Sequence, residues 1–192
     1  MLQTTADEAY GRARALGVHL SALGLSLGGT MALWLAQTRP IDLVIPVSPF
    51  LMPIHLSRGL GTVAMRLLDV LPDQYWWWDP RIKEKSLPLY AYPGYPTHAL
   101  AQCVFLGNAL FGQIPAKPHG RRCTLVTNAN EPAVNDGIAR ELIHRWSQEG
   151  ATCNEVELGD LGPPRHDIID PTTFPAARTL VYPRLQALVL SA

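Results

Sequence analysis

The strongest constraint on the fold is the segment of residues 15–38, which contains no Asp, Glu, Lys or Arg. An apolar segment of this length can cross a bilayer as a single helix. However, it contains His19 and four glycines, and glycines divide an apolar segment into shorter elements. We therefore expect a buried strand over residues 18–25, a tight turn and a helix over residues 30–37, rather than a membrane span.

The rest of the chain alternates between short apolar segments and amphipathic segments. Further strands are expected over residues 43–47, 123–127 and 152–158, and further helices over residues 7–16, over residues 134–148 and from Tyr182 onward. Strands that alternate with helices predict an α/β fold, in which helices flank a parallel sheet. At 192 residues, the chain is expected to form one domain over residues 1–192.

One segment interrupts this alternation. Residues 50–118 are rich in Pro, Leu and aromatic residues and show no period that would extend a sheet. We expect a mostly helical insertion, with helices around residues 60–70 and 97–110, that forms a cap over the carboxyl ends of the strands.

The composition excludes several classes of protein. The 16 basic and 16 acidic residues balance, which argues against the basic surface of a nucleic-acid-binding protein. The three cysteines, Cys103, Cys123 and Cys153, are far apart in the sequence and odd in number. They predict neither a disulfide framework nor a metal site, and we expect them to be small buried side chains. The first ten residues lack the apolar core of a secretory signal, so we expect a cytoplasmic protein.

The turn after the first predicted strand has the sequence GLSLGG, residues 24–29, which contains the pattern G-x-S-x-G. A serine on a sharp strand-to-helix turn is held in a strained backbone conformation, with its oxygen clear of the sheet. The residues two positions before and after it approach closely, and Gly24 and Gly28 have almost no side chain. The N–H of Leu27, at the start of the helix, can stabilise a developing oxyanion. The pattern predicts that Ser26 is a nucleophile.

A serine hydroxyl needs a base to take its proton and an acid to orient that base. His166 is the expected base, because it lies in the loop after the last predicted strand. The other histidines fall in predicted helices or strands, in the insertion, or at the opposite end of the sheet: His19, His55, His98, His119 and His144. Glu131 is the expected acid, as the only carboxylate in the loop after residues 123–127. Its alternative role is to offset the dipole of the next helix, in which case Asp136 is the fallback acid. Asp167 is expected to bind local backbone.

Three ordered segments resemble the α/β-hydrolase superfamily, and within it the serine hydrolases of the monoglyceride lipase, lysophospholipase and serine aminopeptidase type. They are GLSLGG at residues 24–29, NEPAV at residues 130–134 and RHDIIDP at residues 165–171, and YPGYP at residues 92–96 resembles the end of that family's cap. The resemblance implies a Ser26–Glu131–His166 triad and no metal or organic cofactor. In the family the acid precedes a valine by three residues, as Glu131 precedes Val134, although Asp is the commoner acid.

The sequence departs from the family at its start. Family members have several strands and an HG-type loop before the nucleophile, and that loop gives a second oxyanion N–H. We therefore expect residues 18–25 to form a sheet edge and the oxyanion hole to lack one donor. Three interpretations stay open: a longer protein supplies the missing segment, another copy of the chain completes the sheet, or the chain is a weakly active homologue.

The three tryptophans of the insertion, Trp76, Trp77 and Trp78, are expected above Ser26. There they line an apolar site for an acyl chain or aromatic ester, or else pack the insertion onto the body. The sequence as a whole predicts a serine hydrolase that cleaves carboxylic esters through an acyl-enzyme, with a small ester or lipid-like substrate. Two alternatives stay open. One is a non-catalytic or weakly active homologue that binds an apolar ligand or partner, and the other is an aminopeptidase-like amide hydrolase, which requires an acidic group in the substrate site.

Overall fold

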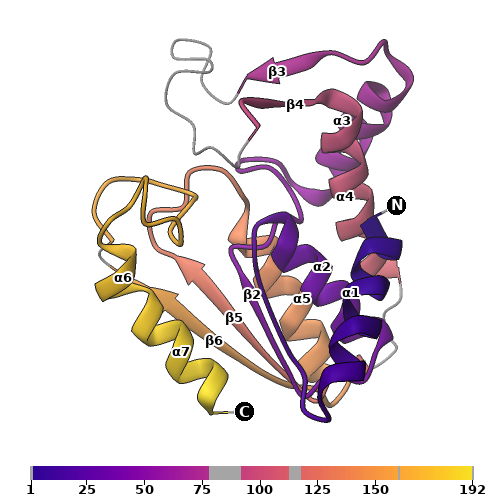
Figure 1. The fold of residues 1–192 in the computed structure, drawn as a ribbon. Helices are drawn as coiled ribbons and strands as arrows, with labels where there is room; N and C mark the ends of the chain where they lie inside the picture. Colours follow the sequence, from indigo (N-terminus) through magenta and orange to yellow (C-terminus); the bar gives the residue numbers. More distant parts are fainter. Residues whose placement is uncertain (1, 78–91, 113–117, 160, 192) are drawn as a thin grey trace.

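A four-stranded parallel sheet forms the centre of the computed structural model, which describes residues 2–77, 92–112, 118–159 and 161–191 (Figure 1). In chain order its strands are β1 (Ser21–Leu25), β2 (Leu43–Val47), β5 (Arg122–Asn128) and β6 (Thr152–Leu158). They are hydrogen-bonded in the order β1-β2-β5-β6, and every pair is parallel. Every residue of β2 is buried, as expected for an apolar strand that is covered on both faces.

Helices cover both faces of this sheet. On one face α1 (Leu2–Leu16), α2 (Leu27–Thr38) and α5 (Asp136–Gln148) share a hydrophobic core with Val44 and Leu125. On the other face α6 (Ala177–Leu180) and α7 (Tyr182–Leu190) pack against Ile45, Val47 and Val126 (Figure 1). Successive side chains of a strand point to opposite faces, so the continuous apolar sequence of β2 supplies both cores. We refer to the sheet and these helices as the body.

The predicted insertion, residues 50–118, lies between β2 and β5. It contains α3 (Arg58–Val70), the short strands β3 (Tyr75–Trp77) and β4 (Gly94–Pro96), and α4 (Thr97–Gly112). Figure 1 shows these elements beyond the carboxyl ends of the sheet strands. Helices α3 and α4 pack together around Met65, Ala101 and Val104. The Asp73 carboxylate accepts hydrogen bonds from the Thr97 hydroxyl and the His98 N–H, which fixes the start of α4.

The structure confirms the predicted α/β architecture. The predicted bounds of β2 and β6 are correct to the residue, but β1 starts at Ser21 rather than at residue 18. The reason is local, because the N–H of Leu20 donates to the Asp42 carboxylate (3.0 Å) and the Leu20 carbonyl accepts the N–H of Asp42 (3.0 Å). Pairing with β2 therefore begins with Ser21 opposite Leu43. The β3–β4 hairpin and α6 were not expected from the sequence.

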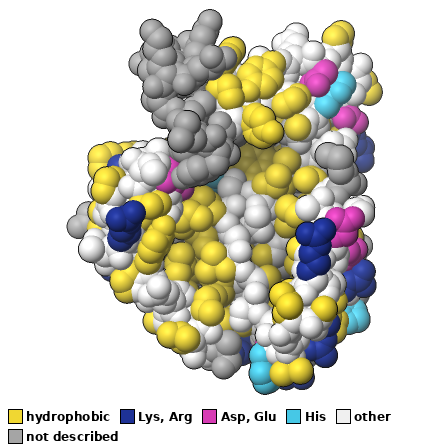
Figure 2. All heavy atoms as spheres, in the orientation of Figure 1, with side chains coloured by type: hydrophobic (Ala, Val, Ile, Leu, Met, Phe, Trp, Pro, Cys, Tyr) yellow, Lys and Arg dark blue, Asp and Glu magenta, His cyan; other side chains and the backbone are white. Residues whose placement is uncertain are grey.

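The uncharged segment of residues 15–38 begins at the end of α1 and is then divided between β1 and α2, as the glycines predicted. Across the described part of the chain, no helix has both the length and the apolar character needed to cross a membrane. In the described sheet β1 is an edge strand, since it pairs with β2 alone. Beside it, Leu23 and the apolar side chains of α7 border a surface hollow of about 550 Å³, in the region where Figure 2 shows hydrophobic side chains.

Candidate active site

The turn that carries Ser26 has the strained geometry predicted for it. Ser26 has φ 55° and ψ −121°, a conformation that side-chain-bearing residues adopt rarely. Its N–H donates to the Val47 carbonyl (3.0 Å), and its own carbonyl accepts the N–H groups of Thr30 and Phe50 (3.0 Å each). These bonds tie the turn to the body and to the start of the insertion, so that the strained conformation persists.

The two flanking glycines approach each other as closely as the pattern requires. A Cβ atom added to Gly24 would lie 2.3 Å from the carbonyl carbon of Gly28. Real Cβ atoms essentially never come so close to backbone. A side chain at Gly24 is therefore incompatible with this turn.

His166 and Glu131 are brought together from two loops at the carboxyl ends of β5 and β6. The His166 Nδ1 atom lies 2.8 Å from the Glu131 Oε1 atom. The Glu131 side chain is only 4% exposed and the His166 side chain 25%. The N–H groups of Ala133 and Val134 also donate to Glu131 Oε1, at 2.8 and 3.3 Å. Two backbone N–H groups thus fix the Glu131 carboxylate, and this carboxylate in turn holds the His166 imidazole.

The charge of Glu131 follows from its surroundings. Burial alone would raise the pKa of Glu131, but the hydrogen bond and positive charge of His166 and the two backbone N–H groups outweigh it and lower the pKa. Glu131 is therefore a carboxylate at neutral pH. A carboxylate on Nδ1 holds the ring in the tautomer whose Nε2 can accept a proton.

The loop that carries His166 is anchored independently of the histidine. The Asn128 side-chain amide donates to the Arg165 carbonyl (2.7 Å). Asp167 accepts the N–H groups of Ile169 (3.2 Å) and Asp170 (3.0 Å), as expected for a residue that binds local backbone. The backbone on both sides of the imidazole is consequently held in place.

Ser26 and His166 line the same cavity, which lies between the body and the insertion and has a volume of about 700 Å³. Figure 2 shows hydrophobic side chains in the hollow where these two parts meet. The remaining described lining residues are apolar or aromatic: Phe50, Pro53, Leu56, Ala64, Met65, Leu67, Leu68, Trp76, Tyr95, Leu100 and Ala133. A cavity of this size and lining suits a small apolar ligand. Apart from Trp76, sequence reasoning missed these residues, because no motif marks them.

The three tryptophans do not share one environment. Trp76 lines the cavity, and its ring meets that of Tyr95 edge to face at 6.3 Å. Trp77 is absent from the described lining and packs edge to face on Tyr75 at 5.4 Å instead. This difference follows from strand geometry, since neighbouring side chains point to opposite faces. Trp78 lies outside the described residues.

The N–H of Leu27 belongs to the first residue of α2. The first N–H groups of a helix have no partner within the helix and carry the positive end of its dipole. The Leu27 side chain lines a different cavity, of about 340 Å³, together with residues of α1 and α4. Only the backbone of Leu27 is therefore a candidate for the site.

A second, polar cavity of about 350 Å³ borders the other side of Glu131. Asp136 lines it and is 8% exposed, and its Oδ1 atom has no hydrogen-bond partner among the described atoms. Burial, followed by the negative charge of Glu131, raises the pKa of Asp136 to about 6. Asp136 was the fallback acid, but it is Glu131 that contacts His166.

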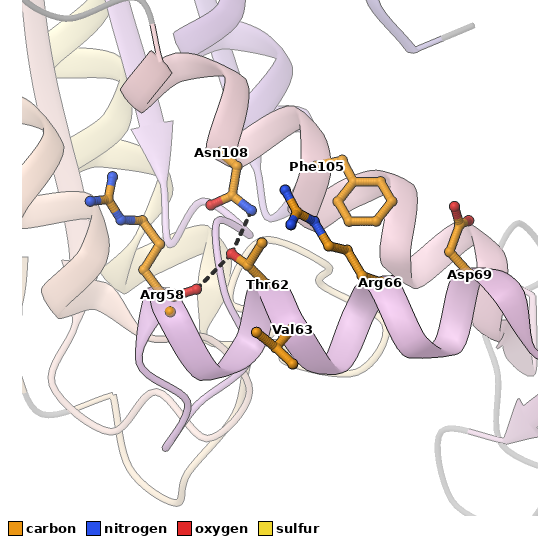
Figure 3. Close-up of a pocket in the computed structure, with 8 residues that line it drawn as sticks. Arg58, Thr62, Val63, Arg66, Asp69, Phe105 and Asn108 are labelled. Carbon is orange, nitrogen blue, oxygen red and sulfur yellow. Dashed lines mark hydrogen bonds between the residues drawn. The ribbon is translucent and has the colours of Figure 1, made fainter.

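Another hollow in the described part of the chain borders the insertion and is not the candidate site. It has a volume of about 780 Å³ and lies between α3 and α4. Figure 3 shows Arg58, Thr62 and Arg66 on one helix and Asn108 on the other, with the Asn108 amide donating to the Thr62 hydroxyl (2.8 Å). Its described lining includes none of the three residues predicted for catalysis.

Comparison with known proteins gives structural matches alone. No family model matches the sequence. No curated protein matches it either. A monoglyceride lipase from Saccharomyces cerevisiae is 14% identical, with a TM-score of 0.66 over 97% of this chain and 67% of the lipase. A monoacylglycerol lipase from Paleococcus ferrophilus is 17% identical, with a TM-score of 0.65 over 100% of this chain and 76% of that one.

The chain has the α/β-hydrolase fold. A third match is one of the metagenome-derived lipolytic enzymes LipS and LipT, at 18% identity and a TM-score of 0.58 over 94% of this chain and 72% of that one. Because all three identities are low, the matches show the fold only. In an α/β hydrolase, the turn after the nucleophile strand and the loops after the later strands are the places where catalytic groups are found. The α/β-hydrolase fold is thus consistent with the positions of Ser26, Glu131 and His166.

Proposed function

We propose that the protein is a serine hydrolase that cleaves carboxylic esters through a covalent acyl-enzyme. Ser26 is the nucleophile, His166 the base and then the acid, and Glu131 the residue that orients His166. The observation that carries the proposal is that Ser26 and His166 line one apolar cavity while His166 is hydrogen-bonded to the buried Glu131. A nucleophile, a base and an orienting acid in this arrangement are the requirements of acyl transfer.

In the proposed reaction, the Ser26 Oγ atom forms a bond to the ester carbonyl carbon while its proton passes to His166 Nε2. The Leu27 N–H stabilises the oxyanion at the start of α2. The tetrahedral intermediate then breaks the bond to the alcohol, which leaves with the proton from His166. Water repeats the sequence on the acyl-enzyme, with His166 again as base, and releases the carboxylic acid.

The cavity lining favours an ester with an apolar acyl chain or an aromatic group. Apolar side chains from α3, the hairpin and α4 surround Ser26 and His166, and they favour ligands that bury hydrocarbon surface.

The same lining disfavours an aminopeptidase, because none of its described residues carries a carboxylate that could bind a substrate amine. Two carboxylates of the insertion are placed elsewhere. Asp69 borders the hollow between α3 and α4 and accepts a hydrogen bond from Gln102, and Asp73 fixes the start of α4. Asp79 and Glu84 lie outside the described residues.

A fluorophosphonate probe tests the nucleophile. We expect the probe to label the folded protein at Ser26, as located by peptide mapping, and Ser26→Ala to lose the label. Ser21→Ala is the matched control, because Ser21 is an exposed serine of β1, the strand that precedes Ser26. Labelling at another serine, or no labelling of folded protein, would overturn the assignment.

Turnover of short-chain p-nitrophenyl esters separates an enzyme from a non-catalytic homologue. We expect hydrolysis by the unaltered chain and its loss in Ser26→Ala. Probe labelling without measurable turnover of esters with two to eight acyl carbons would support the interpretation as a weakly active homologue and would count against an esterase.

A further inference from the structure

Two of the three cysteines are neighbours in the sheet although 30 positions separate them in the sequence. Cys123 in β5 and Cys153 in β6 are register partners. Cys103 lies in α4, away from this pair. The sequence predicted three small buried side chains, but only Cys123 is buried, whereas Cys103 and Cys153 are half-buried. Strand register, which the sequence pattern did not reveal, brings Cys123 and Cys153 together.

The backbone separation of these cysteines suits a disulfide. Adjacent strands lie about 4.7–4.9 Å apart, and disulfides join Cα atoms that are about 4.4–6.8 Å apart. Register partners in a parallel pair also project their side chains to the same face of the sheet. Cys123 belongs to the core on the α1, α2 and α5 face, and Cys153 packs against that same core. Little backbone movement is needed to bring the two sulfur atoms to bonding distance.

The two thiols differ in exposure and in pKa, and these differences assign each thiol a role in oxidation. Cys153 is half-buried on β6, the last strand of the described sheet, whereas Cys123 is 4% exposed. The adjacent Cys123 thiol lowers the pKa of Cys153 to about 7, against the opposing effect of burial. The same neighbouring thiol and burial raise the pKa of Cys123. The more accessible sulfur is thus also the better nucleophile towards an oxidant.

We propose that Cys153 and Cys123 form an oxidation-sensitive pair, which hydrogen peroxide converts to a disulfide between β5 and β6. The Cys153 thiolate attacks one peroxide oxygen, the O–O bond breaks, and sulfenic acid forms with release of hydroxide. The Cys123 sulfur, as its proton leaves, attacks the Cys153 sulfur and displaces hydroxide. In total, two thiols and one peroxide give one disulfide and two waters. The two sulfurs are oxidised and the peroxide is reduced.

The site is independent of the proposed ester hydrolysis. Cys123 and Cys153 are the second residues of β5 and β6, and both strands lead at their other ends to the loops of Glu131 and His166. The disulfide would therefore fasten the strands that carry the acid and the base, at the end remote from these residues. Its detection needs no substrate, so the failure of either proposal leaves the other testable.

Thiol counting after peroxide treatment of the whole chain tests the pair. The unaltered chain has three cysteines. We expect three thiols to fall to one in the denatured protein, and the mass to fall by two hydrogen atoms. A peptide pair that links Cys123 to Cys153 should appear, and dithiothreitol should restore all three thiols. Cys103→Ser should still lose two thiols, whereas Cys153→Ser should lose none.

Three results would overturn the proposal: three thiols and an unchanged mass, added oxygen on Cys153 with Cys123 still a free thiol, or a cross-link between two chains through Cys103. Cys123→Ser replaces a buried side chain and can fail to fold. The decisive measurement is therefore the peptide map of the unaltered chain, with Cys103→Ser as the matched control in α4.

Discussion

In the body, backbone hydrogen bonds fix the residues of the candidate site, whereas in the insertion side-chain packing holds the walls of the cavity. The N–H of Ser26 bonds to Val47, and Glu131 accepts two backbone N–H groups. By contrast, α3 and α4 meet through Met65, Ala101 and Val104, and Leu60, Val63, Leu67 and Val70 of α3 are all more than half exposed.

This difference separates two tasks. Backbone hydrogen bonds within a sheet fix the positions of atoms closely, because moving one strand breaks all of its hydrogen bonds to the next strand. An apolar cavity wall, by contrast, tolerates changes of shape. We therefore expect substitutions in the body to affect the chemical step or the stability of the fold. Substitutions in the insertion should affect substrate binding. The four predictions below test this separation, from the largest expected effect to the smallest.

Glu131→Gln should lower kcat for ester hydrolysis by about 10³–10⁴-fold, with a small change in KM. An amide in place of the carboxylate no longer stabilises the protonated imidazole and favours the wrong tautomer. Steady-state kinetics on a p-nitrophenyl ester measure the effect. The control is Glu157→Gln, which changes an exposed carboxylate on the polar cavity beside Glu131. Equal effects of the two substitutions would exclude Glu131 as the orienting acid.

Gly24→Ala should destabilise the fold by about 3 kcal/mol or more, because the new Cβ atom meets the backbone of Gly28 at 2.3 Å. The matched substitution in the insertion is Gly59→Ala, where a Cβ atom meets nothing within 4 Å. There we expect a gain of about 0.4–1 kcal/mol, since alanine restricts the unfolded chain. Urea unfolding measures both. A Gly24→Ala protein as stable as the parent would contradict the strained turn.

Trp76→Ala should raise KM for esters with an aromatic or long acyl group about tenfold, while kcat changes by less than about threefold. Loss of an aromatic wall weakens apolar binding by about 1–2 kcal/mol without moving catalytic atoms. Trp77→Ala is the control, because Trp77 packs on Tyr75 and lies outside the described lining. A large fall in kcat with Trp76→Ala would show that the insertion also positions the reacting groups.

Asp136→Asn should stabilise the protein by about 1–2 kcal/mol at pH 8. The pKa of Asp136 is raised from 3.8 to about 6 in the folded state. The folded state therefore binds more protons than the unfolded state between these values, and the contribution of Asp136 to stability is lost as pH rises through about 6. The gain from the substitution should shrink as pH falls from 8 to 5. Urea unfolding at both pH values tests this sign, and a gain that grows towards pH 5 would contradict it.

Much of the candidate site was predictable because it depends on local sequence. Gly24 and Gly28 around Ser26 predict the turn without any knowledge of the rest of the fold, and a parallel sheet brings loops after its strands to one edge. That rule was enough to pair Glu131 with His166, which lie 2.8 Å apart in the structure. The bounds of β2 and β6 were also predictable, because each is a short segment between clear turns.

Other features depend on contacts between distant segments, which no local pattern records. Trp76 and Trp77 are adjacent and chemically alike, and the pairing of β3 with β4 decides which of them meets the cavity. Burial raises the pKa of Asp136 only when α5 packs on the sheet. Cys123 and Cys153 become partners through a register that is set where β5 meets β6.

The sequence by itself determined the strained serine, the strand order along the chain and the loops that hold the acid and the base, since these follow from backbone preferences over a few residues. Only the tertiary structure decided the cavity walls, the charge of Asp136 and the thiol pair, because burial and proximity are properties of the packed chain.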